Sequence, residues 1–579
     1  MTSNYSRYAL WVVLAFALWL NYQAWLKDYT AVDAAAVVAA RSAAGGLAGE
    51  IPQSGSASAP GISSAAGSSA AGSSAAAAGA AVAVSAPTGS SLAADASVAA
   101  GPAVRVRTDV FDLMISLTGG TIAQADLNEY TRIKGQTQPV RLENHDSPET
   151  LYLLQTALQG PAGSARPSEL ATFTSSSTDF QMAPGQDELR VPLHWTDDHG
   201  VTVTKEFVFR RGRYAIDVTQ TVDNQSAMPW AVAPYAKILR NDPPTHTSLF
   251  STNPERFATH GPAIWDDKYR KLKITDEDDR HLNIQVKGGW IAALQHQFVT
   301  AVVPPMDIPY TFTMNSRDNE YALAAAGPVT DVPAGASRSF SMTVFLGPKL
   351  QSQLAATGTE LQRVTDFGHL FVIAQPLFKA LSWVHSVTGN WGVAIIIVTL
   401  LLKLIFYPLS EASGKSMAKM RALQPRLKNI QEQYKGDKEK VGRATMELYQ
   451  REKVNPVSGC LPMVIQIPVF FAFYWVLMES VEMRQAPFAL WLNDLSSPDP
   501  YFVLPVLMAG GMFLQQRLNP TSPDPVQAKV MMFMPIAMSA LFAFLPSGLV
   551  LYYVMNTGLG VLQQWNINRR ITAASLRKT

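Results

Sequence analysis

Lys403 is a basic residue inside an apolar stretch of this 579-residue chain. The stretch, WGVAIIIVTLLLKLIFYP at 391–408, is long enough to cross a bilayer. A lysine at the centre of a span costs about 3 kcal/mol, so such a cation is typical of a site that attracts anionic or polar groups. Thr399 lies one helical turn earlier on the same face, which favours a polar stripe facing a helix bundle. Snorkelling is the alternative, because Pro408 follows after about five residues, roughly 8 Å of helix, and the ammonium could reach the headgroups.

Polar side chains recur in the four apolar stretches that follow, at 461–481, 501–516, 530–545 and 549–565. Gln466 and Asn556 are two of them, and in hydrocarbon such amides should face a bundle or a wet cavity. Together with Lys403 and Thr399, they predict a bundle with a hydrophilic groove in its interior.

Methionines collect in the same region, among them Met463, Met508 and Met538. Soft, unbranched side chains fill gaps in any core, but they also suit a surface that accepts many different apolar partners. We therefore expect these three residues to contact a substrate, with core packing as the alternative.

Motifs for catalysis or for a bound cofactor are absent from the sequence. Cys460 is the only cysteine, which excludes an intrachain disulfide, a CxxC site and a thiolate metal cluster. The histidines have no HExxH spacing, and there is no Walker loop, dinucleotide fingerprint or nucleophile motif. The sequence therefore predicts no enzyme activity, no cofactor and no metal site.

A basic segment at 411–456 contains eleven Lys and Arg residues. By the positive-inside rule, this segment lies in the cytoplasm. Gly436 and Asp437 separate one apolar stripe through Leu427 from another through Leu448, which predicts a helical hairpin. Its basic side chains could dock an acidic partner such as a ribosome's RNA, or they could simply be solvated near anionic lipid. The docking candidates are Lys415, Lys419, Arg421, Arg426 and Lys428.

The N-terminal part of the chain predicts an anchor, a tether and a soluble domain. Residues 1–27 hold an apolar run longer than a signal-peptide core and predict an uncleaved membrane anchor, with a cleaved signal peptide as the alternative. Residues 28–104 are rich in Ala, Ser and Gly and predict a disordered tether, because they lack large apolar side chains. Residues 105–363 alternate apolar and polar side chains between turn formers, which predicts an antiparallel β-sandwich. The helical pattern at 364–389 predicts an interfacial amphipathic helix.

The distribution of Lys and Arg predicts on which side of a membrane each segment lies. The helical core at 390–567 is followed by a tail at 568–579 that is basic and has no acidic residue, so the tail should be cytoplasmic. We therefore expect six spans, with both termini in the cytoplasm and the sandwich in the periplasm. In this topology every loop agrees with the positive-inside rule. The predicted fold class is a multi-domain membrane protein with an α-helical transmembrane bundle, a periplasmic antiparallel β-sandwich and a cytoplasmic helical hairpin.

Several long motifs resemble one known family. The segments GNWGVAIIIVTLLLKLIFYPLS, SMAKMRALQP, EKVNPVSGCLPMVIQIPVFFAFYWVL, RQAPFALWLNDLSSPDPYFVLP and AFLPSGLVLYYVMN resemble the YidC family of membrane-protein insertases, which is related to the Oxa and Alb proteins. The anchor and the sandwich are similar to the Gram-negative form of the family. The resemblance covers the whole chain apart from the tether.

The resemblance implies an energy-independent insertase and chaperone of the bacterial inner membrane, in which five of the six spans form the core. It implies a groove open to cytoplasm and lipid, with Lys403 as the cation that receives a substrate's polar tail and Tyr552 and Tyr553 as substrate contacts. The family usually has arginine at the cation's position, and lysine keeps the charge but loses the bidentate fork, which favours point-charge attraction. The implied partners are nascent membrane proteins, the Sec translocon, the ribosome and membrane lipids, with no specific DNA binding.

Two functions from other classes remain as alternatives. An anion transporter would also use Lys403, although no inverted repeat or matching pair of broken helices is visible among the stretches. A membrane-tethered periplasmic carbohydrate-active enzyme is the other alternative, since the sandwich is similar in class to sugar-epimerase folds, and it would need a paired acid and base.

Overall fold

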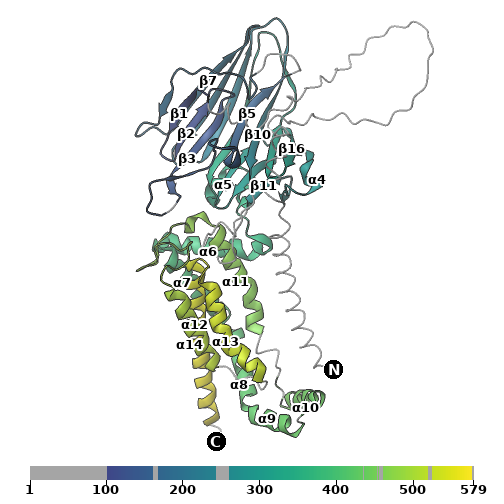
Figure 1. The fold of residues 1–579 in the computed structure, drawn as a ribbon, viewed down its shortest axis with the longest axis vertical. Coiled ribbons are helices and arrows are strands. Elements are labelled where there is room, and N and C mark those ends of the chain that lie inside the picture. Colours follow the sequence, from purple (N-terminus) through teal and green to yellow (C-terminus); the bar gives the residue numbers. More distant parts are fainter. Residues whose placement is uncertain are drawn as a thin grey trace, which may run out of the picture. The chain divides into compact units, whose positions relative to one another are not determined.

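The computed structural model describes residues 101–132, 134–160, 167–242, 260–434, 436–452, 454, 461–518 and 525–576. The predicted anchor, nearly all of the predicted tether and the last three residues of the tail lie outside the described residues. The described chain divides after Thr365 into a unit of β-strands and a unit of helices (Figure 1).

Two sheets form the β-unit of the described chain. The larger sheet has eleven strands. Nine of them follow the order β13 (Asn283–Lys287), β16 (Pro309–Arg317), β17 (Glu320–Ala326), β10 (Trp230–Asn241), β5 (Tyr152–Gln159), β3 (Thr121–Thr131), β2 (Phe111–Ser116), β1 (Ala103–Arg107) and β6 (Asp179–Gln181). In addition, β18 (Thr330–Val332) pairs with β10, and β4 (Pro139–Arg141) pairs with β3. The smaller has eight strands in the order β12 (Tyr269–Lys271), β11 (His260–Trp265), β14 (Trp290–Gln295), β15 (Phe298–Val303), β19 (Ser337–Pro348), β9 (Ala215–Asn224), β8 (Val201–Arg210) and β7 (Glu188–Thr196). Short helices α4 (Glu277–Arg280) and α5 (Gln351–Thr357) complete the unit.

Alternating burial along the strands explains why the two sheets stack. In β9, every second residue from Ile216 to Asn224 is buried, as expected when one face of a strand meets a core. The inner faces share a core that includes Phe111, Trp290 and Phe345, each at most 1% exposed. This confirms the predicted β-sandwich. One detail differs from an antiparallel fold, because β1 and β6 pair in parallel.

Lys205 connects the two sheets through a buried ammonium group. It lies in β8 of the smaller sheet, and its side chain is fully buried. The ammonium donates hydrogen bonds to the carbonyl oxygens of Gly119 (3.0 Å), Gly120 (2.8 Å) and Thr156 (2.5 Å), which belong to the larger sheet and its β2–β3 turn. Burial lowers the pKa of Lys205 to about 7, because apolar surroundings disfavour the charged form.

We expect Lys205→Met to destabilise the sandwich by about 3 kcal/mol, because three buried carbonyls would lose their donor. The pKa adds a pH dependence: between pH 7 and about 10 the unfolded chain holds a proton that the folded chain has released, so the free energy of unfolding should increase with pH. The methionine variant should lack this increase. Hydrogen exchange of the β5 and β8 amides in the full-length chain measures both effects, and unchanged exchange rates would show that the ammonium is not a tie between the sheets.

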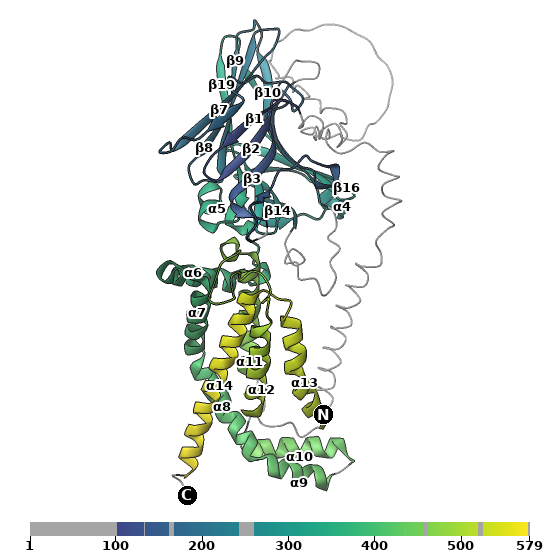
Figure 2. The ribbon, with the colours of Figure 1, turned by 60° about the vertical axis from the view of Figure 1, so that its left-hand side comes forward.

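Nine helices form the helical unit within the described residues (Figures 1 and 2). They are α6 (Phe371–Thr388), α7 (Trp391–Ile405), α8 (Tyr407–Ala422), α9 (Gln424–Gln433), α10 (Lys438–Arg451), α11 (Leu461–Glu479), α12 (Val503–Leu518), α13 (Pro525–Phe542) and α14 (Ser547–Leu576). Helix α6 lies in the segment for which an interfacial helix is predicted, and its exposed Trp383 (67%) and Val387 (73%) fit such a role.

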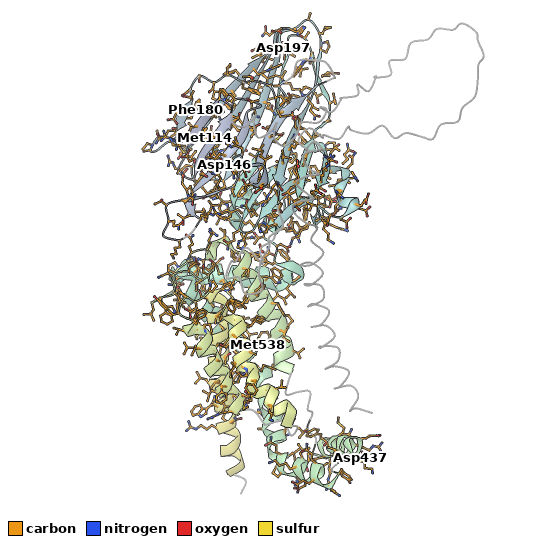
Figure 3. The ribbon with its side chains drawn as sticks, in the orientation of Figure 1. Met114, Asp146, Phe180, Asp197, Asp437 and Met538 are labelled. Carbon is orange, nitrogen blue, oxygen red and sulfur yellow. The ribbon has the colours of Figure 1, made fainter. Side chains whose placement is uncertain are left out.

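Helices α9 and α10 lie side by side where the sequence predicts a hairpin (Figure 2). Asp437 lies in the turn between them, and its carboxylate accepts a hydrogen bond from the Lys440 backbone N–H at 3.1 Å, which caps α10 (Figure 3). The predicted hairpin began at residue 411, but residues 411–422 belong to α8, which continues from α7.

The apolar stretch that holds Lys403 is bent. Helix α7 ends at Ile405, and the axis turns by 62° before α8 begins at Tyr407. Within the described residues, no single helix combines the length and the hydropathy needed for a membrane span, while α7 and the first part of α8 reach both only as this bent pair. The count of six spans therefore stays a prediction.

Asp494 accepts several hydrogen bonds at one end of the helical unit, and we call this group of contacts the Asp494 node. Its carboxylate accepts hydrogen bonds from the Ser496 backbone N–H (2.9 Å), from the Ser497 hydroxyl (2.8 Å) and from the Gln485 backbone N–H in the loop that follows α11 (3.1 Å). Its carbonyl accepts from the hydroxyl of Ser547, the first residue of α14 (2.9 Å). Asp499 nearby accepts from a backbone N–H in the first turn of α12 (2.7 Å). This Asp494 node therefore ties the loop after α11 to the start of α14, and Asp499 separately caps α12.

Candidate functional site

An open cavity brings together residues of α7, α8, α11 and α14. It encloses about 430 Å³ of space, including the part that is continuous with solvent. Its polar lining residues are Thr399, Lys403, Ser410, Gln466 and Asn556, and its other lining residues are Leu402, Phe406, Leu409, Ile465, Val469 and Tyr552. All four residues predicted to form the groove thus line one cavity, although they come from distant parts of the sequence.

The Lys403 side chain faces the interior of the bundle. A Cβ placed on Gly560 of α14 would lie 3.6 Å from the Lys403 Nζ and 3.5 Å from the Gln515 Nε2 of α12. A glycine at this position therefore leaves room for the ammonium beside two neighbouring helices. Within the described residues, no hydrogen bond or ion pair of this ammonium is found. This placement argues against snorkelling, in which the ammonium would point out of the bundle.

The other polar groups of the cavity bond to one another or to their own helix. The hydroxyl of Thr399 donates to the Ile395 carbonyl at 2.6 Å, so its proton is used inside α7. The Ser410 hydroxyl donates to a carbonyl one turn earlier in the same way, at 3.1 Å. The Gln466 side-chain amide of α11 donates instead to the Asn556 side-chain oxygen of α14. Lys403 is therefore the one polar side chain of this lining for which the described residues supply no bonding partner.

The two tyrosines predicted as substrate contacts belong to an aromatic cluster. Tyr552 is 2% exposed and stacks on Phe473, with ring centroids 4.2 Å apart. Tyr553 is half-buried and packs against Phe542, with ring centroids 5.1 Å apart. Tyr552 reaches the cavity wall, whereas Tyr553 is not part of the lining. The two predicted contacts therefore differ, because only Tyr552 borders the cavity.

Two of the three methionines predicted to contact substrate lie in or against the core of the helical unit. Met508 is fully buried in the helical core, which matches the alternative of core packing. Met538 on α13 is half-buried against that core (Figure 3). The side chain of Met463 lies outside the described residues. Three further methionines of the same group lie on α13 and are exposed, namely Met531 (38%), Met532 (49%) and Met534 (48%).

The basic docking candidates divide into paired and unpaired side chains. Lys415 forms an ion pair with Glu411 at 2.8 Å, and Arg426 forms one with Glu452 at 2.6 Å. Lys419 and Lys428 are exposed and have no acidic partner among the described residues, while the Arg421 side chain lies outside that description. The positive charge offered to a partner therefore comes mainly from the unpaired lysines.

Gly560 and Gln515 flank the ammonium. Gln515 is one of the polar side chains in the apolar stretches that were expected to face a bundle or a wet cavity, whereas sequence reasoning missed Gly560. An isolated glycine inside a helix weakens it by about 1 kcal/mol and often has a packing reason, so Gly560 was a signal that could have been followed. No signal in the sequence could pair it with Lys403, because the two residues are joined only by the packing of α7 against α14.

Comparisons with known proteins place the chain in a family. The family model described as 60Kd inner membrane protein matches residues 383–574, and the model described as YidC periplasmic domain matches residues 103–380. The membrane protein insertase YidC of Pseudomonas putida is 44% identical over 477 residues, which are 82% of this chain and 84% of the relative. The corresponding insertase of Methylococcus capsulatus is 45% identical over 479 residues, which are 82% of this chain and 87% of the relative.

A crystal structure of an active YidC insertase with its first transmembrane domain resolved is 19% identical, with a TM-score of 0.36, and covers 80% of this chain and 95% of that chain. The two family models together span most of the sequence, and the relatives are named as insertases rather than as enzymes. The match also identifies an inner-membrane protein with a periplasmic domain. This chain therefore belongs to the YidC family of membrane protein insertases.

Proposed function

We propose that this chain integrates newly made proteins into the inner membrane and that the cavity around Lys403 receives the polar residues that must cross it. The observation that carries the proposal is the Lys403 ammonium, which lies in a cavity lined by two amides and has no carboxylate partner among the described residues. A cation without a counter-charge attracts the carboxylates and carbonyl oxygens of a passing segment, and more strongly where water is scarce.

The cavity lowers the cost of moving a polar tail. A tail that enters directly from water into lipid loses its hydrogen bonds at once, whereas Gln466 and Asn556 offer replacement partners as the water is shed. The apolar part of the substrate gains about 25 cal/mol per Å² when it leaves water for an apolar surface. Exposed Ile467 and Phe471 on α11, each 48% exposed, supply such a surface. Neither step requires a nucleotide.

The finer topology and the partners are part of the same proposal. We place both termini and the α9–α10 hairpin in the cytoplasm, with six spans in total and the sandwich in the periplasm. The ribosome docks on the exposed Lys419 and Lys428, and the chain also works beside the Sec translocon as a chaperone. The exposed methionines of α13 and the surrounding lipid contact the apolar segment of the substrate.

Reconstitution tests the proposed function directly. The purified full-length chain in liposomes should insert a single-span substrate with a short polar tail, so that a fragment of the substrate is protected from added protease. Insertion should exceed that of protein-free liposomes and should not depend on added nucleotide. Equal protection in empty liposomes, or a strict need for nucleotide, would contradict the proposal.

A further inference from the structure

Gln515 of α12 lies close to the Lys403 ammonium. A Cβ on Gly560 of α14 would lie 3.5 Å from the Gln515 Nε2 and 3.6 Å from the Lys403 Nζ. The two nitrogen atoms are therefore at most about 7 Å apart, which is the sum of these distances. Lys403 lines the cavity and Gln515 does not, so the ammonium links the cavity to α12.

The packing of α12 against α14 explains why Gln515 points to this place. The two helices approach each other closely at Gly511, where an added Cβ would lie 3.1 Å from the Thr557 Cγ2. Gln515 follows Gly511 by four residues and Gly560 follows Thr557 by three, so both lie one turn further along the same faces. Because Gly560 has no side chain, the longer side chain of Gln515 has room between the helices.

Neither of the two nitrogen atoms is used by the protein itself. Within the described residues, no hydrogen bond of the Gln515 side chain and none of the Lys403 side chain is found. Both side chains are half-buried, so bulk water reaches only part of each. Donors in such surroundings normally have an acceptor, because an unmade hydrogen bond costs free energy. Two neighbouring donors without an acceptor therefore favour a site that takes its acceptor from a ligand.

A carboxylate matches these two donors. Each of its oxygens can accept one hydrogen bond, and charge-assisted bonds of this kind are about 2.8 Å long, so a carboxylate can bridge nitrogen atoms at this separation. An arginine offers two parallel N–H donors from one side chain, whereas a lysine is a point charge. The Gln515 amide thus adds the second donor that Lys403 lacks. A carboxamide fits less well, because it is neutral and only one of its two ends is an acceptor.

We propose that Gln515 is a specificity-determining residue, which together with the Lys403 ammonium binds a side-chain carboxylate of the polar segment that enters the cavity. Lys403 supplies the charge, and the Gln515 Nε2–H adds a directional bond to this attraction. An aspartate or glutamate of the segment is then held, while a glutamine of the same shape is not. The inference rests on the proposed function, and it names acidic side chains as the groups that this site selects.

Two matched substrates measure the selection in liposomes that contain the full-length chain. They are single-span proteins that differ only in one position of the short translocated tail, which is glutamate in one and glutamine in the other. The readout is the ratio of their insertion rates, glutamate over glutamine. Gln515→Leu should lower this ratio about tenfold, because a hydrogen bond to a charged group is lost. An unchanged ratio would overturn the proposal.

A second substitution at the same position reverses the interaction. Gln515→Glu should lower the ratio further than Gln515→Leu, because its carboxylate would pair with the Lys403 ammonium and repel the carboxylate of the substrate. A ratio at or above that of the unchanged chain would contradict a carboxylate site.

The Lys403→Arg background separates recognition from folding. The guanidinium presents both donors by itself, so Lys403→Arg with Gln515→Leu should show the same ratio as Lys403→Arg alone. If Gln515 only packs α12 against α14, Gln515→Leu should impair both substrates equally in both backgrounds. That result would overturn the proposal even where the variant folds poorly.

Gln516 provides a matched control on the same helix. It follows Gln515 directly and is also half-buried, but its side chain leaves α12 in a direction about 100° away. Gln516→Leu should leave the ratio unchanged, and a decrease equal to that of Gln515→Leu would overturn the assignment to Gln515. Failure of the unchanged chain to insert either substrate would count against the proposed function. Insertion with a ratio that no Gln515 variant alters would count against the carboxylate site alone.

Discussion

Replacing Lys403 by glutamate is expected to reduce the insertion of substrates with acidic translocated tails more than tenfold. Two unit charges about 4 Å apart interact with about 4 kcal/mol at an effective dielectric constant near 20, and the substitution turns this attraction into repulsion. The Lys403 ammonium has no carboxylate partner among the described residues, so no compensating ion pair would soften the change. Insertion of two single-span substrates, one with an acidic and one with a neutral tail, in cells depleted of the native protein measures the effect.

Three further variants separate charge from position. Lys403→Arg should retain function, because point-charge attraction does not need the ammonium shape. Lys403→Ala should impair chiefly the acidic tail. Gly560→Leu keeps the charge but fills the space in front of the Nζ, so it should reproduce the alanine result, whereas Gly560→Ala adds only an ordinary contact at 3.6 Å and should be tolerated. Equal insertion of both substrates by wild type and Lys403→Ala, at matched expression, would show that the cation only anchors a helix end.

Removal of residues 424–451 is expected to abolish insertion while the other helices remain in the membrane. These residues are α9 and α10, and replacing them by a short Gly/Ser linker leaves α8 complete. The hairpin has few buried contacts with the rest of the unit, so its loss should spare folding while it removes the surface on which a ribosome would dock. Insertion and membrane extraction of the variant measure the two effects, and normal insertion at equal protein level would contradict a role for the hairpin.

Ion pairing within the helical unit provides a control for the docking surface. Lys419→Glu with Lys428→Glu should weaken ribosome co-sedimentation strongly, because both lysines are exposed and have no acidic partner among the described residues. Lys415→Gln with Arg426→Gln should have a smaller effect, since their charges are already balanced by Glu411 and Glu452. Both effects should shrink as salt is added. Equal effects of the two double variants would show that net charge alone, and not the unpaired side chains, governs the docking.

Much of the fold could be predicted because it follows from local patterns. Period-two alternation predicted the sandwich, and the apolar stretches at 461–481 and 501–516 foreshadowed α11 and α12. Gly436 and Asp437 marked the turn between α9 and α10, because glycine readily adopts the positive φ of a turn and the Asp437 side chain caps α10. The bend after Ile405 was not predicted, although Pro408 in the first turn of α8 is a position where a proline favours the start of a new helix.

The candidate site was only partly predictable, because side-chain type does not fix the direction in which a residue points. Polarity inside apolar stretches was enough to find Lys403, Thr399, Gln466 and Asn556, since buried polar groups must meet one another. Met508 and Tyr552 are buried by packing between helices that are distant in the sequence, and no local pattern encodes that packing. The parallel pairing of β1 with β6 and the hydrogen bonds of Lys205 likewise join residues that are far apart in the sequence, so no local pattern predicts them.

The Asp494 node bears on the electrical insulation of the membrane. Its carboxylate and its carbonyl hold the loop after α11 and the start of α14 together, while the stacked Phe473 and Tyr552 pack α11 against α14 in the helical core. Both contacts fill the space between these two helices with packed side chains. If polar segments enter the cavity as we propose, such packing opposes a continuous file of water, along which ions or protons would discharge the gradient across the membrane.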